Sequence, residues 1–170
     1  LGSLPIHPKA EDPVARVRMQ WACSHFFPAA AMAAHVTRWG GRPLHFGCAV
    51  ALSGRFGLDL DLDALDEDEW RACSAAAALA KRTRPLVQRG ELVRLVSPVD
   101  GADRSRAALA YVGDDGDSSV LFAYQLESTD EPGPSLALDW LNTDGSYTVA
   151  EIDLASGHEP VVRQVSGRDL

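Results

Sequence analysis

The stretch "MAAHVTRWGGRP" at residues 32–43 contains the feature on which the fold depends. Its first five residues are apolar except for one histidine, which is typical of a short strand buried on both faces. The Gly-rich segment that follows predicts a loop. Because a single buried strand needs neighbours, we expect this stretch to belong to a parallel sheet or a (β/α) barrel.

Helical patterns flank this strand on both sides. Asp12 and Pro13 match the N-cap and the first position of a helix, which should end near Phe27, before Pro28. Apolar and small residues at 44–55 predict a second, buried helix.

A third helix should begin after the acidic stretch "LDLDLDALDEDEW" at residues 58–70. The alternation of Leu with Asp predicts an extended segment with one apolar face. Asp66 and Glu69 then match a capping box at the start of an Ala-rich helix. Pro85 should break or kink this helix, and Gly90 should end it.

The same acidic stretch begins like the calcium loop of an EF-hand, with Asp59, Asp61 and Asp63 at its first, third and fifth positions. Ala64 and Trp70 then stand where that loop requires Gly and Glu. Helix capping is therefore the favoured interpretation, and we predict no metal site.

The sequence changes character after Gly90. Five or six short β-rich runs follow, with turn segments between them, and this spacing predicts an antiparallel sandwich. The runs are "LVRLVSP" (92–98), "AALAYVG" (107–113), "SVLFAYQLE" (119–127), "SLALDWL" (135–141), "SYTVAEIDL" (146–154) and "PVVRQVSG" (160–167).

Composition excludes several classes of protein. The 170 residues are 46% apolar and 24% charged, and the net charge of −8 disfavours nucleic-acid binding. The sequence contains no run of 18 apolar residues, so it predicts no membrane span, and it shows no secretory signal pattern. Cys23, Cys48 and Cys73 cannot all pair, so we expect buried free thiols in a reducing, cytoplasmic compartment. Gly-rich phosphate loops and paired histidines are absent, so we expect no cofactor.

Five stretches resemble, in order, the C-terminal end of the α-galactosidases of glycoside hydrolase family 36. The resemblance runs from about Asp12 to the end of the chain. It is carried by "DPVARVRMQWACSHFFP" (12–28), "MAAHVT" (32–37), "RPLHFGCAVALSGRFGLDLDLDAL" (42–65), "RPLVQRGELVRLVSP" (84–98) and "LALDWLNTDGSYTV" (136–149).

This resemblance implies an α+β fragment: the last strand and helices of a (β/α)₈ barrel, followed by an antiparallel β-sandwich domain. Residues 1–90 would be the C-terminal segment of the catalytic barrel, and residues 91–170 the sandwich. "MAAHV" would be the eighth barrel strand, with the next two helical segments as the eighth helix and its extension. The chain would be truncated at both ends.

The resemblance also implies retaining hydrolysis of terminal α-galactosides such as raffinose-type sugars, carried out by two aspartates. The family's nucleophile lies in a Lys-x-Asp motif that this chain lacks. Its acid/base is the first Asp of a Ser-Asp-x-x-Asp motif, where Pro8 and Lys9 occupy the Ser and Asp positions. Asp12 matches the second Asp, for which we favour helix capping. The chain alone should be inactive, with no catalytic residue of its own.

Two residues are predicted to contact sugar. His35 lies near the carboxyl end of the presumed barrel strand, which faces the active site in such barrels, and Trp39 on the following loop could stack on a sugar ring. A core histidine is the alternative for His35. The alternative function is a non-catalytic β-sandwich module that binds sugar or docks on a partner.

An oligomeric assembly is also expected. A cut barrel edge should expose apolar surface, and that surface should promote association of the chain with copies of itself. The side chains expected at this edge are Val14, Val17, Met32 and Val36.

Overall fold

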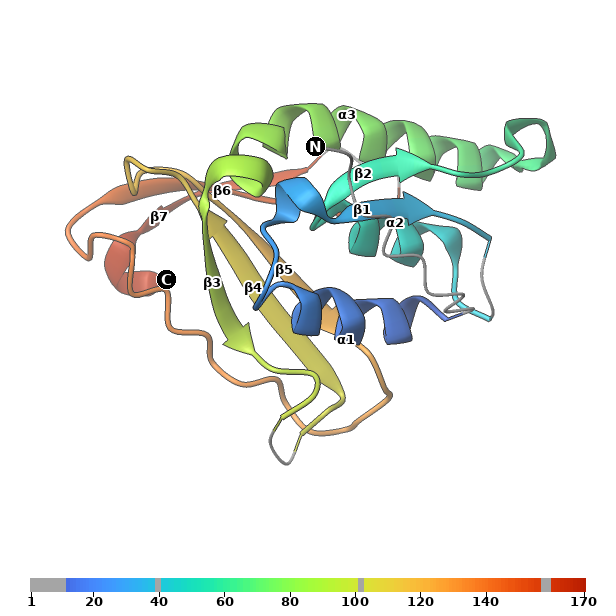
Figure 1. Ribbon diagram of the computed structural model, residues 1–170. Coiled ribbons are helices and arrows are strands. Elements are labelled where there is room, and N and C mark those ends of the chain that lie inside the picture. Colours follow the sequence, from blue (N-terminus) through green and yellow to red (C-terminus); the bar gives the residue numbers. More distant parts are fainter. Residues whose placement is uncertain (1–11, 39–40, 101–102, 157–159) are drawn as a thin grey trace.

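A computed structural model describes residues 12–38, 41–100, 103–156 and 160–170. The N-terminal half alternates helices with two short strands (Figure 1). The elements are α1 (Pro13–Cys23), η1 (Ala29–Ala31), β1 (Ala33–Val36), α2 (Leu44–Leu52), β2 (Arg55–Leu58), η2 (Leu62–Ala64) and α3 (Glu67–Arg89).

The β1 strand has a parallel neighbour, as its apolar sequence predicts. It pairs with β2 from Ala33 opposite Arg55 to Val36 opposite Leu58, and α2 connects the two strands. Within the described part of the chain, β1 and β2 pair only with each other. "MAAHV" is therefore followed by a second parallel strand, and the prediction that it is the last barrel strand is wrong.

The predicted helix at 44–55 is also too long. The α2 helix ends at Leu52, and the chain turns at Gly54 into β2. A Cβ atom at Gly54 would lie 3.0 Å from Ala34 Cβ and 3.1 Å from the Met32 carbonyl oxygen. This close approach lets β2 begin directly beside β1. Such a contact is made in three dimensions, so the local apolar pattern cannot reveal it.

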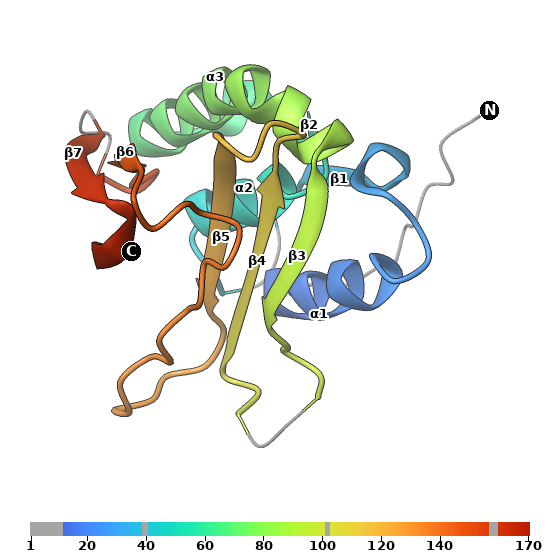
Figure 2. The same cartoon turned by 90° about the vertical axis from the view of Figure 1, so that its left-hand side faces the viewer.

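The C-terminal half contains antiparallel sheets. A three-stranded sheet has the order β3-β4-β5, and β6 pairs with β7 in a separate two-stranded sheet. Figure 2 shows β3, β4 and β5 side by side beneath α3, with the β6–β7 pair to one side. The strands are β3 (Glu91–Val96), β4 (Arg106–Val112), β5 (Ser119–Gln125), β6 (Ser146–Glu151) and β7 (Val161–Ser166), followed by η3 (Gly167–Asp169).

Five of the six predicted β-rich runs form these strands, but "SLALDWL" at 135–141 does not. The run is irregular and ends in a turn, where the Leu141 N–H donates to the Leu138 carbonyl at 2.9 Å. Leu136 and Leu138 are half-buried and alternate with exposed residues. The alternation is therefore real, but no described strand pairs with it.

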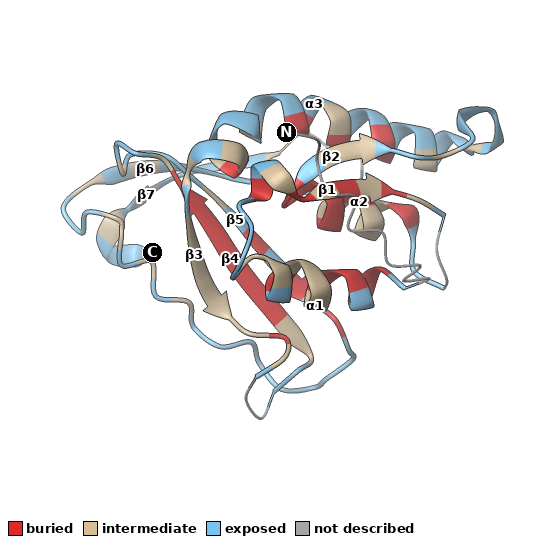
Figure 3. Ribbon diagram, in the orientation of Figure 1, coloured by how far each residue is buried: buried red, intermediate tan, exposed pale blue. Residues whose placement is uncertain are grey.

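One apolar core joins the two halves. It contains Trp21, Val50 and Ala76 from the helices, and Leu109 and Phe122 from the antiparallel sheet. The β4 strand is buried along nearly its whole length (Figure 3). No described helix has both the length and the apolar character that crossing a membrane requires.

The expected exposed apolar edge is not found. Val14, Val17, Met32 and Val36 are each 5% exposed or less, because α1, α2 and the strands pack together around them. The prediction of exposed apolar surface at these four residues is wrong, so they give no reason to expect association. Exposed apolar side chains occur elsewhere, at Val161 and Val162 of β7.

Helix ends follow the predicted local chemistry. Asp12 caps α1 by accepting from the Val14 N–H at 3.0 Å. Asp66 and Glu69 form the predicted capping box at the start of α3. That helix continues past Pro85 and is capped by Gly90, so the proline does not break it.

Candidate functional site

The candidate site is the carboxyl edge of the β1–β2 pair. Parallel strands end at the same edge, and in α/β proteins this edge carries the binding and catalytic loops. Residues 37–43 follow β1 there, and residues 59–66 follow β2. The Asp59 N–H donates to the Val36 carbonyl at 2.9 Å, which extends the contact between the strands one residue past the end of β2.

An arginine joins the two loops. Arg38 Nη1 and Nη2 donate to the two carboxylate oxygens of Glu69 at 2.7 and 2.8 Å, and Nη2 also donates to the Ala64 carbonyl at 3.1 Å. Glu69 in turn accepts from the Asp66 N–H at 3.2 Å. The bonds from Arg38 hold the pKa of Glu69 below its ordinary value. The β1 loop is therefore tied to the start of α3.

His35 faces the opposite side of β1 from the helices. Its neighbours Ala34 and Val36 are fully buried, and Val36 packs near Gly47 of α2. Alternation along the strand places the half-buried His35 on the other face. Its ring covers Gly57 of β2, where an added Cβ would lie 2.7 Å from His35 Cδ2. Only a residue without a side chain leaves the ring this room.

The backbone of His35 is held from the helix side. The guanidinium group of Arg16, only 6% exposed, donates to the His35 carbonyl. Burial lowers the pKa of Arg16 to about 10. Removing a cation from water costs free energy, and a hydrogen bond in the interior offsets part of that cost. The bond from Arg16 therefore fixes the guanidinium group against the backbone of β1.

Trp39, the second predicted sugar contact, lies outside the described residues. Thr37, two residues earlier in the sequence, has a buried hydroxyl oxygen with no hydrogen-bond partner among the described residues. The sequence interpretation missed Thr37, Arg38 and Gly57. Arg38 could have been found as the one arginine between β1 and the Gly pair, but its partner Glu69 was interpreted only as a cap.

The acidic residues near this edge serve local structure. Asp61 accepts from the Asp63 N–H at 3.2 Å in η2, and Asp66 accepts from the Glu69 N–H at 2.8 Å. Within the described ranges, no group of three or more His, Cys, Asp or Glu side chains is placed to hold a metal ion. Lys9 and Pro8, at the positions of the acid/base motif, lie outside those ranges.

The chain is similar to known glycosidases. The melibiase family matches residues 7–90. Alpha-galactosidase C of Emericella nidulans is 35% identical over 146 residues, which cover 81% of this chain and 19% of the relative. Alpha-galactosidase AgaA of Geobacillus stearothermophilus is 34% identical over 156 residues, which cover 87% of this chain and 21% of the relative.

Solved structures agree with the sequence matches. A variant of the GH36 α-galactosidase AgaA from Geobacillus stearothermophilus in complex with raffinose has a TM-score of 0.76 and 28% identity, covering 95% of this chain and 22% of that one. AgaB from the same organism has a TM-score of 0.72 and 30% identity, covering 81% and 20%. The chain thus spans about a fifth of the length of the curated relatives it matches.

Proposed function

Since the chain belongs to the glycoside hydrolase family 36 α-galactosidases, we propose that it forms the carboxyl-terminal part of a retaining enzyme that hydrolyses terminal α-galactosides. The supporting observation is the β1–α2–β2 unit. At its carboxyl edge, Arg38 of the first loop donates to Ala64 of the second and to Glu69 at the start of α3. Retaining hydrolysis needs two carboxyl groups about 5–5.5 Å apart. The chain matches the motif of neither, so it should not turn over substrate alone.

The proposed fold is also based on the relationship to the glycoside hydrolase family 36 α-galactosidases. Residues 1–90 would be the final segment of a (β/α)₈ barrel, with further parallel strands adding to the β1–β2 pair. Residues 91–170 would be the antiparallel sandwich that packs against it. The apolar core that includes both α2 and β4 supports a fixed interface between the two. The buried thiols of Cys48 and Cys73 support a reducing, cytoplasmic compartment.

Within such a barrel, His35 and Trp39 would line the sugar-binding side. His35 is half-buried on the face away from the helices, which is the inner face of a barrel. A ring held over Gly57 keeps one orientation, and this suits a contact to a sugar hydroxyl.

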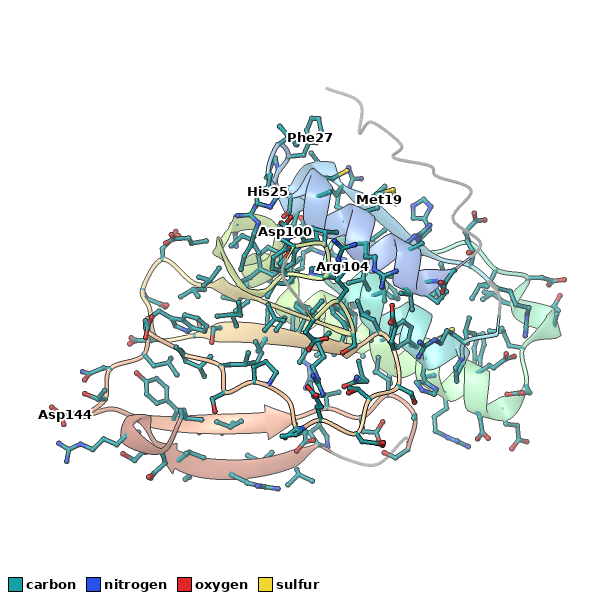
Figure 4. The ribbon with its side chains drawn as sticks, turned by 90° about the horizontal axis from the view of Figure 1, so that it is seen from below. Met19, His25, Phe27, Asp100, Arg104 and Asp144 are labelled. Atoms are coloured by element: carbon teal, nitrogen blue, oxygen red, sulfur yellow. The ribbon has the colours of Figure 1, made fainter. Side chains whose placement is uncertain are left out.

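A chimera tests this function. The matching carboxyl-terminal segment of AgaA is replaced by this chain, and hydrolysis of an aryl α-galactoside is measured. We expect turnover by the chimera and none by the 170-residue chain alone. His35→Ala in the chimera should raise KM, whereas His25→Ala should not, because His25 is exposed on the segment between α1 and β1 (Figure 4). A soluble chimera without turnover would contradict the proposal.

A second candidate is the β-sandwich module that binds sugar or docks on a partner. The exposed Val161 and Val162, at 54% and 60%, favour it because they leave apolar surface on the β6–β7 pair. Titration of the chain with raffinose tests sugar binding. Light scattering at rising protein concentration tests docking on a second copy of the chain. A flat titration together with a monomer at all concentrations would argue against sugar binding and self-association alike.

A further inference from the structure

A cavity of about 440 Å³ opens at the opposite, amino edge of the β1–β2 pair. Its walls come from three places in the fold. They are η1 before β1, the end of α2 with the start of β2, and the second half of α3. The cavity is therefore separated from the carboxyl-edge loops by the length of the strands.

Two of the described residues that line this cavity carry a positive charge. Arg55 begins β2 and Arg84 lies on α3, and both are exposed. None of the described residues that line the cavity is acidic. Among the described residues, neither guanidinium group forms an ion pair or a side-chain hydrogen bond. Two like charges on one cavity repel each other, and a bound anion would offset that repulsion.

Apolar side chains make up only part of the remaining surface, and Ala30 and Phe56 are the more accessible of them. Leu52, Ala80 and Val87 are buried, and Phe56 is half-buried against the core. Gln88 contributes an amide that makes no hydrogen bond to another described residue. The volume is in the range of small-molecule sites, which span roughly 300–1,000 Å³, and far exceeds that of one phosphate ion.

We propose that this cavity binds a small organic phosphate monoester. Its phosphate would be held between Arg55 and Arg84, and its carbon skeleton would contact Ala30 and Phe56. A phosphate monoester carries about −1.5 to −2 charges at neutral pH, which matches two guanidinium groups better than a single carboxylate does. Guanidinium groups also donate paired hydrogen bonds that suit phosphate oxygens.

Calorimetric titration of the 170-residue chain tests the site with three probes: phenyl phosphate, inorganic phosphate and phenol. We expect phenyl phosphate to bind most tightly, inorganic phosphate more weakly, and phenol not at all. Arg55→Gln and Arg84→Gln should each weaken phenyl phosphate binding by about tenfold, since each removes a charge-assisted hydrogen bond. Arg82→Gln is the matched control, because Arg82 is exposed on α3 but does not line the cavity.

Each result decides the proposal. Arg84→Lys keeps the charge, so it should retain more affinity than Arg84→Gln in a chain with an unchanged far-UV circular dichroism spectrum. The absence of binding heat with phenyl phosphate at about 10 mM would overturn the proposal. The dissociation constant would then exceed about 10 mM, which corresponds to a binding free energy of less than about 3 kcal/mol in magnitude. Equal weakening by Arg82→Gln and Arg84→Gln would also overturn it, because attraction would then come from the whole basic helix.

Discussion

The hydroxyl of Tyr111, in β4, donates a 2.8 Å hydrogen bond to the carbonyl of Ser53, between α2 and β2. Both residues are buried. The bond links the antiparallel sheet to the turn that starts the second parallel strand. A second hydrogen bond of the same kind comes from Tyr124 of β5, whose hydroxyl donates to the Ala49 carbonyl of α2 at 3.2 Å. The two halves are therefore joined by polar as well as apolar contacts.

Tyr111→Phe should lower the free energy of unfolding by roughly 1–3 kcal/mol, because it leaves the buried Ser53 carbonyl without this donor. Urea unfolding followed by tryptophan fluorescence measures the change. Tyr147→Phe is the control, since the Tyr147 hydroxyl bonds to Asn142 in an exposed part of the chain. Equal destabilisation by the two changes would contradict the importance of the link to Ser53.

Glu69→Gln should reduce stability at neutral pH and flatten the acid part of the pH profile. Arg38 lowers the pKa of Glu69 in the folded state. A carboxylate with a lowered folded pKa stabilises the fold above its unfolded pKa, and this contribution is lost as pH falls through the folded value. Thermal unfolding between about pH 2 and 7, which brackets the ordinary carboxylate pKa values of about 3.9–4.3 and extends below them, measures it.

Glu67→Gln is the matched control for that change. Glu67 occupies the same helical turn, is exposed, and forms no ion pair with another described residue. An unchanged acid profile in Glu69→Gln, or the same flattening in both variants, would show that the Arg38 contact does not set the pH dependence.

Gly57→Ala should displace the His35 ring, because the new Cβ would lie 2.7 Å from His35 Cδ2. The histidine ring signals in a proton–carbon NMR spectrum should therefore shift. Gly41→Ala is the control, since a Cβ there meets no atom within 4 Å. Unmoved His35 signals in Gly57→Ala would mean that the ring does not rest on β2.

Cys23 should react with iodoacetamide before Cys48 and Cys73 in the native chain at mildly alkaline pH. Cys23 is half-buried, whereas the other two are 0% and 2% exposed, with their sulfurs 4.0 Å apart. Burial raises the pKa of both Cys48 and Cys73, which removes the reactive thiolate. Mass spectrometry of timed labelling, with a urea-unfolded sample as the control, gives the order. Labelling of Cys48 as fast as Cys23 would contradict the buried position.

Local signals predicted the features that depend on a few neighbouring residues. The Asp12 cap, the Asp66–Glu69 capping box and the end of α3 at Gly90 were all readable in order along the chain. The turn segment "GDDGDSS" (113–119), between two of the predicted β-rich runs, joins β4 to β5 with Gly116 at a φ of +70°. Each is set by hydrogen bonds or dihedral preferences within a few residues.

Features that depend on distant partners were missed. The four-residue β2 carries too little periodicity to separate it from the end of α2, and it is a strand because β1 lies beside it. "SLALDWL" has a strand pattern but no partner. Arg38 reaches Glu69 across 31 positions, a distance at which sequence spacing carries no contact information.

By itself, the sequence determined the helices, most strands and the family relationship, because propensity, capping and apolar alternation act over short distances. Only the tertiary structure decided that residues 55–58 of this chain are the parallel partner of "MAAHV", that Val14 and Val36 are buried, and that Arg55 and Arg84 share one cavity. These contacts join residues that are far apart in the sequence. Their free energy depends on which side chains folding places next to each other, and local sequence patterns do not contain that information.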